Sequence, residues 1–121
     1  MKTIIKKRIN DNIFKRSLNI AFCEDTDENI DKLAKWMGIE ASILAEQIYG
    51  LEAVTLGLTD KKDGSIHSFI WCKRFDVKLI VHELCHFTHI SLDTVGVSRN
   101  EDETFAYFLE YYLSEILKLN K

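Results

Sequence analysis

The 121-residue sequence contains no proline, only three cysteines and no apolar run long enough to cross a membrane. Without proline, glycines and short polar clusters must separate the helices and strands. Cys23, Cys72 and Cys85 are odd in number and widely spaced, which argues against a disulfide framework and predicts reduced, buried thiols. No Cys-x-x-Cys pair occurs, so the thiolate type of zinc site has no support.

An excess of basic charge is also missing. The chain has 16 Lys and Arg against 19 Asp and Glu, with a net charge of −3, so we expect no nucleic-acid partner. The first eight residues are basic, but charge returns before a signal-peptide core can form, so we expect a cytoplasmic protein without a membrane partner. The hydrophobic and charged fractions, 46% and 29%, are typical of one globular domain spanning residues 1–121.

The first half of the chain shows both helical and strand periodicity. Ile5, Ile9 and Ile13 have a helical spacing that predicts a short amphipathic helix. Apolar residues alternate over 17–23, which predicts a strand. Asp25 and Glu28 resemble a capping box for a helix over 27–37, and a second helix follows over 40–49. Gly38 and Gly50 would end these helices.

The second half begins with a hairpin and continues with two helices. Alternation over 54–59, a turn at 60–64 and a strand over 66–72 predict the hairpin. Asp76 is placed to cap a helix over 77–91, and an apolar stripe predicts a last helix over 101–119. We therefore predict an α+β domain with a small antiparallel sheet or hairpin packed on helices.

The residues that point to chemistry are Val-His-Glu-Leu-Cys-His at 81–86. Four residues apart on a helix, His82 and His86 project from one face and can reach one metal ion. Glu83 lies on the flank of that face, where it can take a proton from a water that zinc has made acidic. The alternative is a core helix with two incidental histidines. Because unpaired imidazoles are costly in an apolar helix, zinc is favoured.

A catalytic zinc site takes three protein ligands, so the sequence must supply a third. The extended motif with a later glycine and histidine fails, because those positions hold His89 and Leu92. The start of the last helix offers Glu101, Asp102 and Glu103, and periodicity alone does not choose among them. A solvated acidic first turn, favoured by the helix dipole, is the alternative for all three.

The neighbours of Glu103 favour it over Glu101. Ala106 is small enough to let this helix approach the histidine helix closely, and Tyr107 would hydrogen-bond a ligand or a substrate oxygen. Glu110 would lie on the same side of the helix as Glu103 and is a candidate hydrogen-bond partner for a histidine N–H. His89 lies near the same face and would steady a transition-state oxyanion, or simply make a local hydrogen bond.

The segments 70–73, 81–88, 103–107 and 110–113 together resemble the small zincin-like proteins of bacteriophages and prophages, and more broadly the gluzincin metallopeptidases. The resemblance covers the second half of the chain. It implies a minimal zincin-like domain with His82, His86 and Glu103 as zinc ligands and Glu83 as general base and acid. It also implies that the strand over 66–72 is the edge strand along which an extended peptide aligns. Tyr107 departs from the family, because thermolysin-like gluzincins have an aspartate there.

Three functions are compatible with these residues. The first is a zinc-dependent peptidase or related amide hydrolase acting on a peptide or protein, with selectivity from the hairpin, a partner or a homodimer. The second is a zinc-stabilised binding module that has kept the site and lost turnover. The third is a structural helix that binds no metal.

Overall fold

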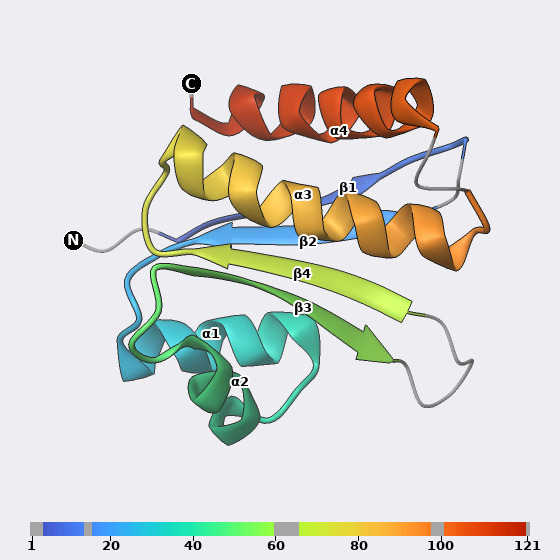
Figure 1. Cartoon of the computed structure of the whole chain (residues 1–121). Helices are drawn as coiled ribbons and strands as arrows, with labels where there is room; N and C mark the ends of the chain where they lie inside the picture. The colour runs from blue at the N-terminus through green and yellow to red at the C-terminus, as the bar shows by residue number, and fades with distance from the viewer. Residues whose placement is uncertain (1–3, 14–15, 60–65, 98–100, 121) are drawn as a thin grey trace.

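A computed structural model describes residues 4–13, 16–59, 66–97 and 101–120. These residues form three layers, with helices covering both faces of a four-stranded sheet (Figure 1). The predicted α+β class is confirmed. The strands, in the spatial order β1-β2-β4-β3, are β1 (Ile5–Asn10), β2 (Ser17–Phe22), β3 (Ala53–Thr59) and β4 (Ile66–Cys72).

The sheet is mixed rather than antiparallel. β3 and β4 form the predicted antiparallel hairpin, whose expected turn at 60–64 lies outside the described residues. β1 also pairs antiparallel with β2, but β2 and β4 run parallel, with Ile20 opposite Ile70. The expectation of a wholly antiparallel sheet is therefore wrong. The parallel pair arises because α1 (Asp27–Met37) and α2 (Ala41–Ile48) carry the chain back across the sheet.

The N-terminal segment is a strand, so the predicted amphipathic helix is wrong. Ile9 is buried in β1, whereas the basic residues Lys6, Lys7 and Arg8 are exposed. Residues four apart lie on one face of a helix, about one turn from each other. They also lie on one face of a strand, because side chains alternate between the two faces. Antiparallel pairing with β2 decides between the two.

One helical layer consists of α1 and α2. α1 has the predicted bounds and ends at Gly38, whose φ of 73° is the left-handed conformation that glycine accepts readily. Its N-cap is Thr26 rather than Asp25, since the Thr26 hydroxyl accepts a hydrogen bond from the Asn29 amide at 3.2 Å. The layer buries the face of the sheet that carries Phe69 and Trp71.

The other helical layer consists of α3 (Val77–Thr94) and α4 (Asp102–Leu117), followed by a 3₁₀ turn, Lys118–Asn120. Asp76 caps α3 as predicted, accepting a hydrogen bond from the Lys78 amide at 2.9 Å. The two helices run antiparallel above the sheet (Figure 1), and the ring of Phe87 packs 4.9 Å from that of Tyr112. This layer buries the other face of β2 and β4.

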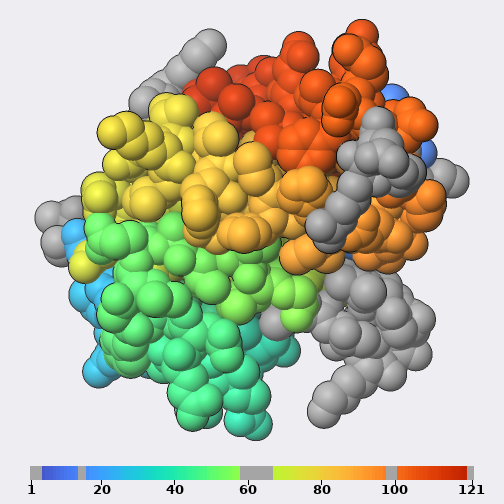
Figure 2. Space-filling view, viewed as in Figure 1, coloured from blue at the N-terminus to red at the C-terminus, as the bar shows by residue number. Residues whose placement is uncertain are grey.

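α3 buries only one of its sides. Leu84 and Phe87 face the core, while His82 and His86 are on the exposed side. On the face shown in Figure 2, α3 lies between β3 and α4. No helix within the described ranges is long and apolar enough to cross a membrane.

Candidate metal centre

The two histidines of the motif lie together on the exposed side of α3. Their ring centroids are 5.0 Å apart and their planes are nearly perpendicular, at 80°. The side chain of His82 is 68% exposed, and no aromatic or aliphatic core surrounds either ring. This arrangement follows from the helix itself, which places residues i and i+4 on one side one turn apart. Two imidazole donors therefore face the same region of solvent.

Glu83 points in another direction and is nearly buried, with only 9% of its side chain exposed. The Thr55 hydroxyl lies 2.8 Å from Oε1 of Glu83 and 3.0 Å from its backbone carbonyl oxygen. The second carboxyl oxygen, Oε2, lies 4.0 Å from Nε2 of His82. One oxygen thus accepts a hydrogen bond from β3, and the other lies on the side of the His82 ring.

Thr55 contacts the motif through Glu83, and no pattern in the sequence singles it out. The alternation of apolar residues over 54–59 predicts a half-buried strand, in which Thr55 lies on the side opposite Val54 and Leu56. The structure places Val54 and Leu56 in the α1–α2 layer and Thr55 under α3. One feature of the sequence could have pointed to it. Because Val54 and Leu56 occupy one face of the strand, the hydroxyl of Thr55 must lie on the other face.

A buried cysteine of the sheet lies near Glu83. Cys72 of β4 is fully buried, and burial raises the pKa of its thiol to about 12, with a further contribution from the negative charge of Glu83. Burial likewise raises the pKa of Cys23. These two cysteines have no disulfide partner, as expected, and Cys85 is also a free thiol but only half-buried.

Glu103 is not brought to the histidines. It is exposed in the first turn of α4, as are Glu101 and Asp102. The register between the antiparallel helices is set by His89, whose ring lies 4.7 Å from that of Phe105. Glu103 precedes Phe105 and therefore lies beside the part of α3 beyond His89. Within the described ranges, no three His, Cys, Asp or Glu residues are grouped so as to hold a metal ion.

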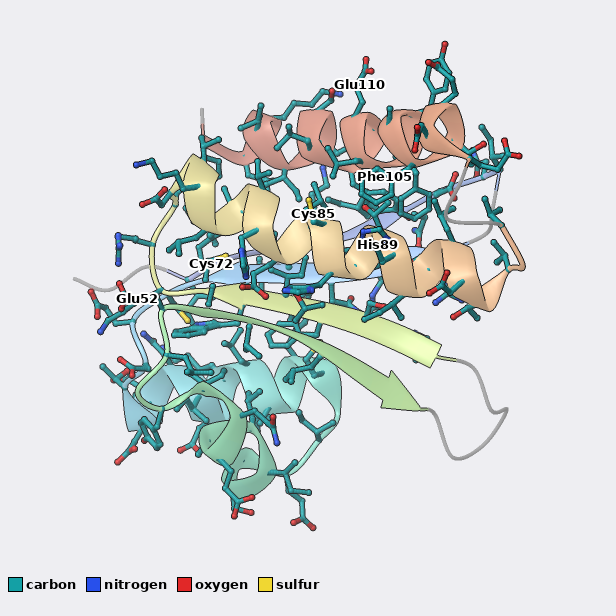
Figure 3. The ribbon with its side chains drawn as sticks, in the orientation of Figure 1. Glu52, Cys72, Cys85, His89, Phe105 and Glu110 are labelled. Carbon is teal, nitrogen blue, oxygen red and sulfur yellow. The ribbon has the colours of Figure 1, made fainter. Side chains whose placement is uncertain are left out.

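Three other predicted site residues have contacts or exposure of their own. The ring of His89 packs against that of Phe105 at 4.7 Å between centroids, with the planes tilted by 42° (Figure 3), which fits a local contact better than an oxyanion role. Tyr107 is 69% exposed and lines a hollow with Asn12 and Ile13. Glu110 points away from α3 (Figure 3). The roles assigned to these residues and to Glu103 stay predictions.

The edge strand differs from the expected one. β4 has neighbours on both sides, β2 and β3, so it cannot be the edge along which a peptide pairs. The reason is visible in its sequence, since Phe69, Ile70, Trp71 and Cys72 are all apolar and all buried, which is typical of a strand covered on both faces. The edge next to the motif is β3, the strand that carries Thr55.

The donor set fits zinc in part. Two exposed imidazoles and an adjacent carboxyl group are the donor and base types of a catalytic zinc site. The third protein ligand that such a site takes is not in place among the described residues. Zinc binding by three protein donors therefore requires the first turn of α4 to approach α3, or a donor other than Glu103.

Comparison of the chain with protein-family models, with curated proteins and with solved structures found no match.

The Thr55–Glu83 hydrogen bond should contribute measurably to stability. Thr55→Val keeps the shape of the side chain and removes the donor, which leaves a nearly buried carboxyl group without this partner. We expect a loss of about 1–3 kcal/mol in the free energy of unfolding, measured by urea denaturation. Thr55→Ser, which retains the hydroxyl, is the matched control and should lose clearly less. An unchanged free energy of unfolding in Thr55→Val would contradict a stabilising role for this hydrogen bond, because valine removes only the hydroxyl.

Proposed function

We propose that the chain is a zinc-dependent peptidase or related amide hydrolase with its centre on the exposed side of α3. The single observation that carries the proposal is the arrangement of His82, Glu83 and His86. Two imidazoles share one side of the helix at 5.0 Å between ring centroids, and the Glu83 carboxyl group, which lies beside His82, accepts a hydrogen bond from Thr55. The resemblance of the motif to zincin-like phage proteins and gluzincins supports the same activity, and with it a zincin-like fold.

His82 and His86 would supply two ligands, and Glu103 is the proposed third. Zinc bound there would polarise a substrate carbonyl and lower the pKa of a bound water. Glu83 would take a proton from the attacking water through Oε2, the oxygen that Thr55 leaves free, and would pass it to the leaving amine. Thr55 would hold the carboxyl group in place during both transfers.

The substrate in this proposal is an extended peptide. β3 ends the sheet on the side of the motif, so its outer edge presents backbone donors and acceptors next to the histidines. A peptide that pairs with this edge would pass Thr55 and bring a carbonyl group towards His82 and His86. This places substrate binding on β3 and not on β4.

A zinc-stabilised binding module without turnover is the second candidate. The observation that favours it is that no group of three His, Cys, Asp or Glu residues able to hold a metal ion is assembled within the described ranges, so the site lacks a feature that turnover would need. Both candidates require metal, so the metal content tests them together. A variant without the proposed general base, Glu83, separates them.

Metal content should depend on the two motif histidines and not on others. Protein purified without chelator should contain about one zinc per chain by elemental analysis. The zinc content of His82→Ala and of His86→Ala should fall below about 0.2 equivalents per chain. A site with so few protein ligands cannot retain zinc once one of them is removed. These side chains are exposed, so the fold should survive both changes.

His89→Ala is the matched control, because His89 lies on the same helix with its ring on Phe105. It should keep its metal. Glu103→Ala and Glu101→Ala, measured side by side, identify the third ligand by which of them loses zinc. Wild-type protein with less than about 0.2 equivalents, or a His89→Ala protein that loses as much as His82→Ala, would contradict the proposed centre.

Glu83→Gln should separate an enzyme from a binding module. Glutamine keeps the size of the side chain and an oxygen that accepts from Thr55, but it cannot take a proton. We expect unchanged zinc content and peptide cleavage slowed by at least about 100-fold, followed by mass spectrometry of a peptide mixture. Glu46→Gln, an exposed change on α2, is the control. Equal cleavage by wild type and Glu83→Gln would remove Glu83 from the mechanism, and zinc-loaded wild type without any cleavage would favour the module.

A further inference from the structure

Gly57 lies inside β3, on the face of that strand that meets α3. Val54 and Leu56 pack in the α1–α2 layer, whereas Thr55 contacts Glu83 of α3. Because side chains alternate between the two faces of a strand, position 57 shares the face of Thr55. The glycine therefore lies two residues along the strand from the contact that connects β3 to the motif.

No feature of the fold requires a glycine at position 57. The pairing of β3 with β4 is regular and has no bulge, and the φ of Gly57 is not positive. A Cβ atom added there would meet no atom of another residue within 4 Å, apart from its chain neighbours. A glycine inside a strand weakens the strand, and besides bulges and bends it marks the close approach of a ligand or of another backbone. Close approach is the reason that remains.

The backbone at Gly57 is uncovered on its α3 side. The residue is exposed, and its partner on β4, Ser68, is too small to lie over it. On its other side β3 has no neighbour within the described sheet. A strand that pairs there would place one side chain about 5 Å from position 57, on the same face. Aromatic side chains on a neighbouring strand are suited to cover an edge glycine.

The helix supplies an apolar side chain next to this open space. Ile90 is 46% exposed and lies seven residues, about two turns, beyond Glu83, so both are on the same side of α3. α3 and β3 run in the same direction (Figure 1). Seven helical residues advance about 10 Å from Glu83, and the two residues from Thr55 to Gly57 advance about 7 Å. Gly57 therefore lies level with the stretch of α3 between His86 and Ile90.

We propose that Gly57 and Ile90 form the subsite for an aromatic side chain of an extended peptide substrate. The inference rests on the proposed function, which pairs such a peptide with the edge of β3. The aromatic ring would lie on the backbone at Gly57, in the space that a larger residue there would fill, with one edge against Ile90. Removing the ring and the exposed isoleucine from water supplies the favourable free energy. The centre would accordingly act on peptide bonds close to phenylalanine, tyrosine or tryptophan.

The test is an NMR titration of ¹⁵N-labelled Glu83→Gln protein with one equivalent of zinc added, in which the peptide stays intact. Two blocked heptapeptides are compared: Lys-Thr-Gln-Phe-Gln-Thr-Lys and its counterpart with alanine in place of phenylalanine. We expect shifts in β3 and around Ile90. The phenylalanine peptide should bind about three- to fivefold more tightly, the effect of one aromatic contact between strands.

Gly57→Val, added to this protein, should remove the difference between the two peptides, because valine fills the space. Its midpoint of urea unfolding should be at or above that of the starting protein, since a good strand former replaces glycine and its Cβ meets no atom within 4 Å. Ile90→Ala should halve the preference for phenylalanine. Asn10→Val, an exposed change on the opposite edge strand β1, is the matched control and should keep the preference.

Equal binding of the two peptides by the starting protein, binding of neither peptide, or a preference that survives Gly57→Val would overturn the proposal. These outcomes are separate from those that decide the hydrolase, because zinc content and peptide cleavage are not measured in the titration. A chain whose Glu83→Gln form prefers the phenylalanine peptide, and whose wild type cleaves nothing, would retain this subsite and lose the enzymatic activity.

Discussion

The hydrogen bond from Thr55 to Glu83 connects the edge strand of the sheet to the helix that carries both histidines. It is a side-chain contact between residues 28 positions apart, and it determines which way the carboxyl group points. Without a partner, a glutamate on the flank of an exposed helix face would extend into solvent. With Thr55 beneath it, Glu83 stays nearly buried and directs one oxygen towards His82. The proposed chemistry depends on that orientation.

The layered packing makes this contact possible. Helices cover both faces of β2 and β4, so the two central strands bury apolar side chains on both sides, together with the polar Asn19 and Ser68. β3 is different, because its Thr55 lies under α3 and its outer edge has no strand beside it in the described sheet. β3 is half-buried over 53–56 and open at its edge, so in the proposed mechanism it would hold both the Glu83 side chain and a substrate backbone.

Local patterns predicted the elements well and their arrangement less well. The capping residues and glycines define α1 and α3 because those signals act over one turn of helix. β1 was mistaken for a helix since the spacing of Ile5 and Ile9 fits both structures. The parallel pairing of β2 with β4 has no local signal either, because it joins segments about 50 residues apart and depends on burying both faces.

Some parts of the candidate site likewise follow from local sequence patterns, and others depend on tertiary packing. His82, Glu83 and His86 follow from the helical period alone, so the sequence is sufficient to bring the imidazoles together. Thr55 could not be found because it depends on which strand lies under α3. The place of Glu103 depends on the register between α3 and α4, which ring contacts such as His89 with Phe105 set. The third ligand is accordingly the least determined part of the proposed centre.

X-ray absorption at the zinc edge of the purified protein tests the central claim most directly, because it counts the imidazoles bound to the metal. The account predicts two imidazole nitrogens at about 2.0–2.1 Å, with the remaining positions filled by oxygen. A sulfur shell at about 2.3 Å, a single imidazole, or zinc surrounded only by oxygen would contradict it.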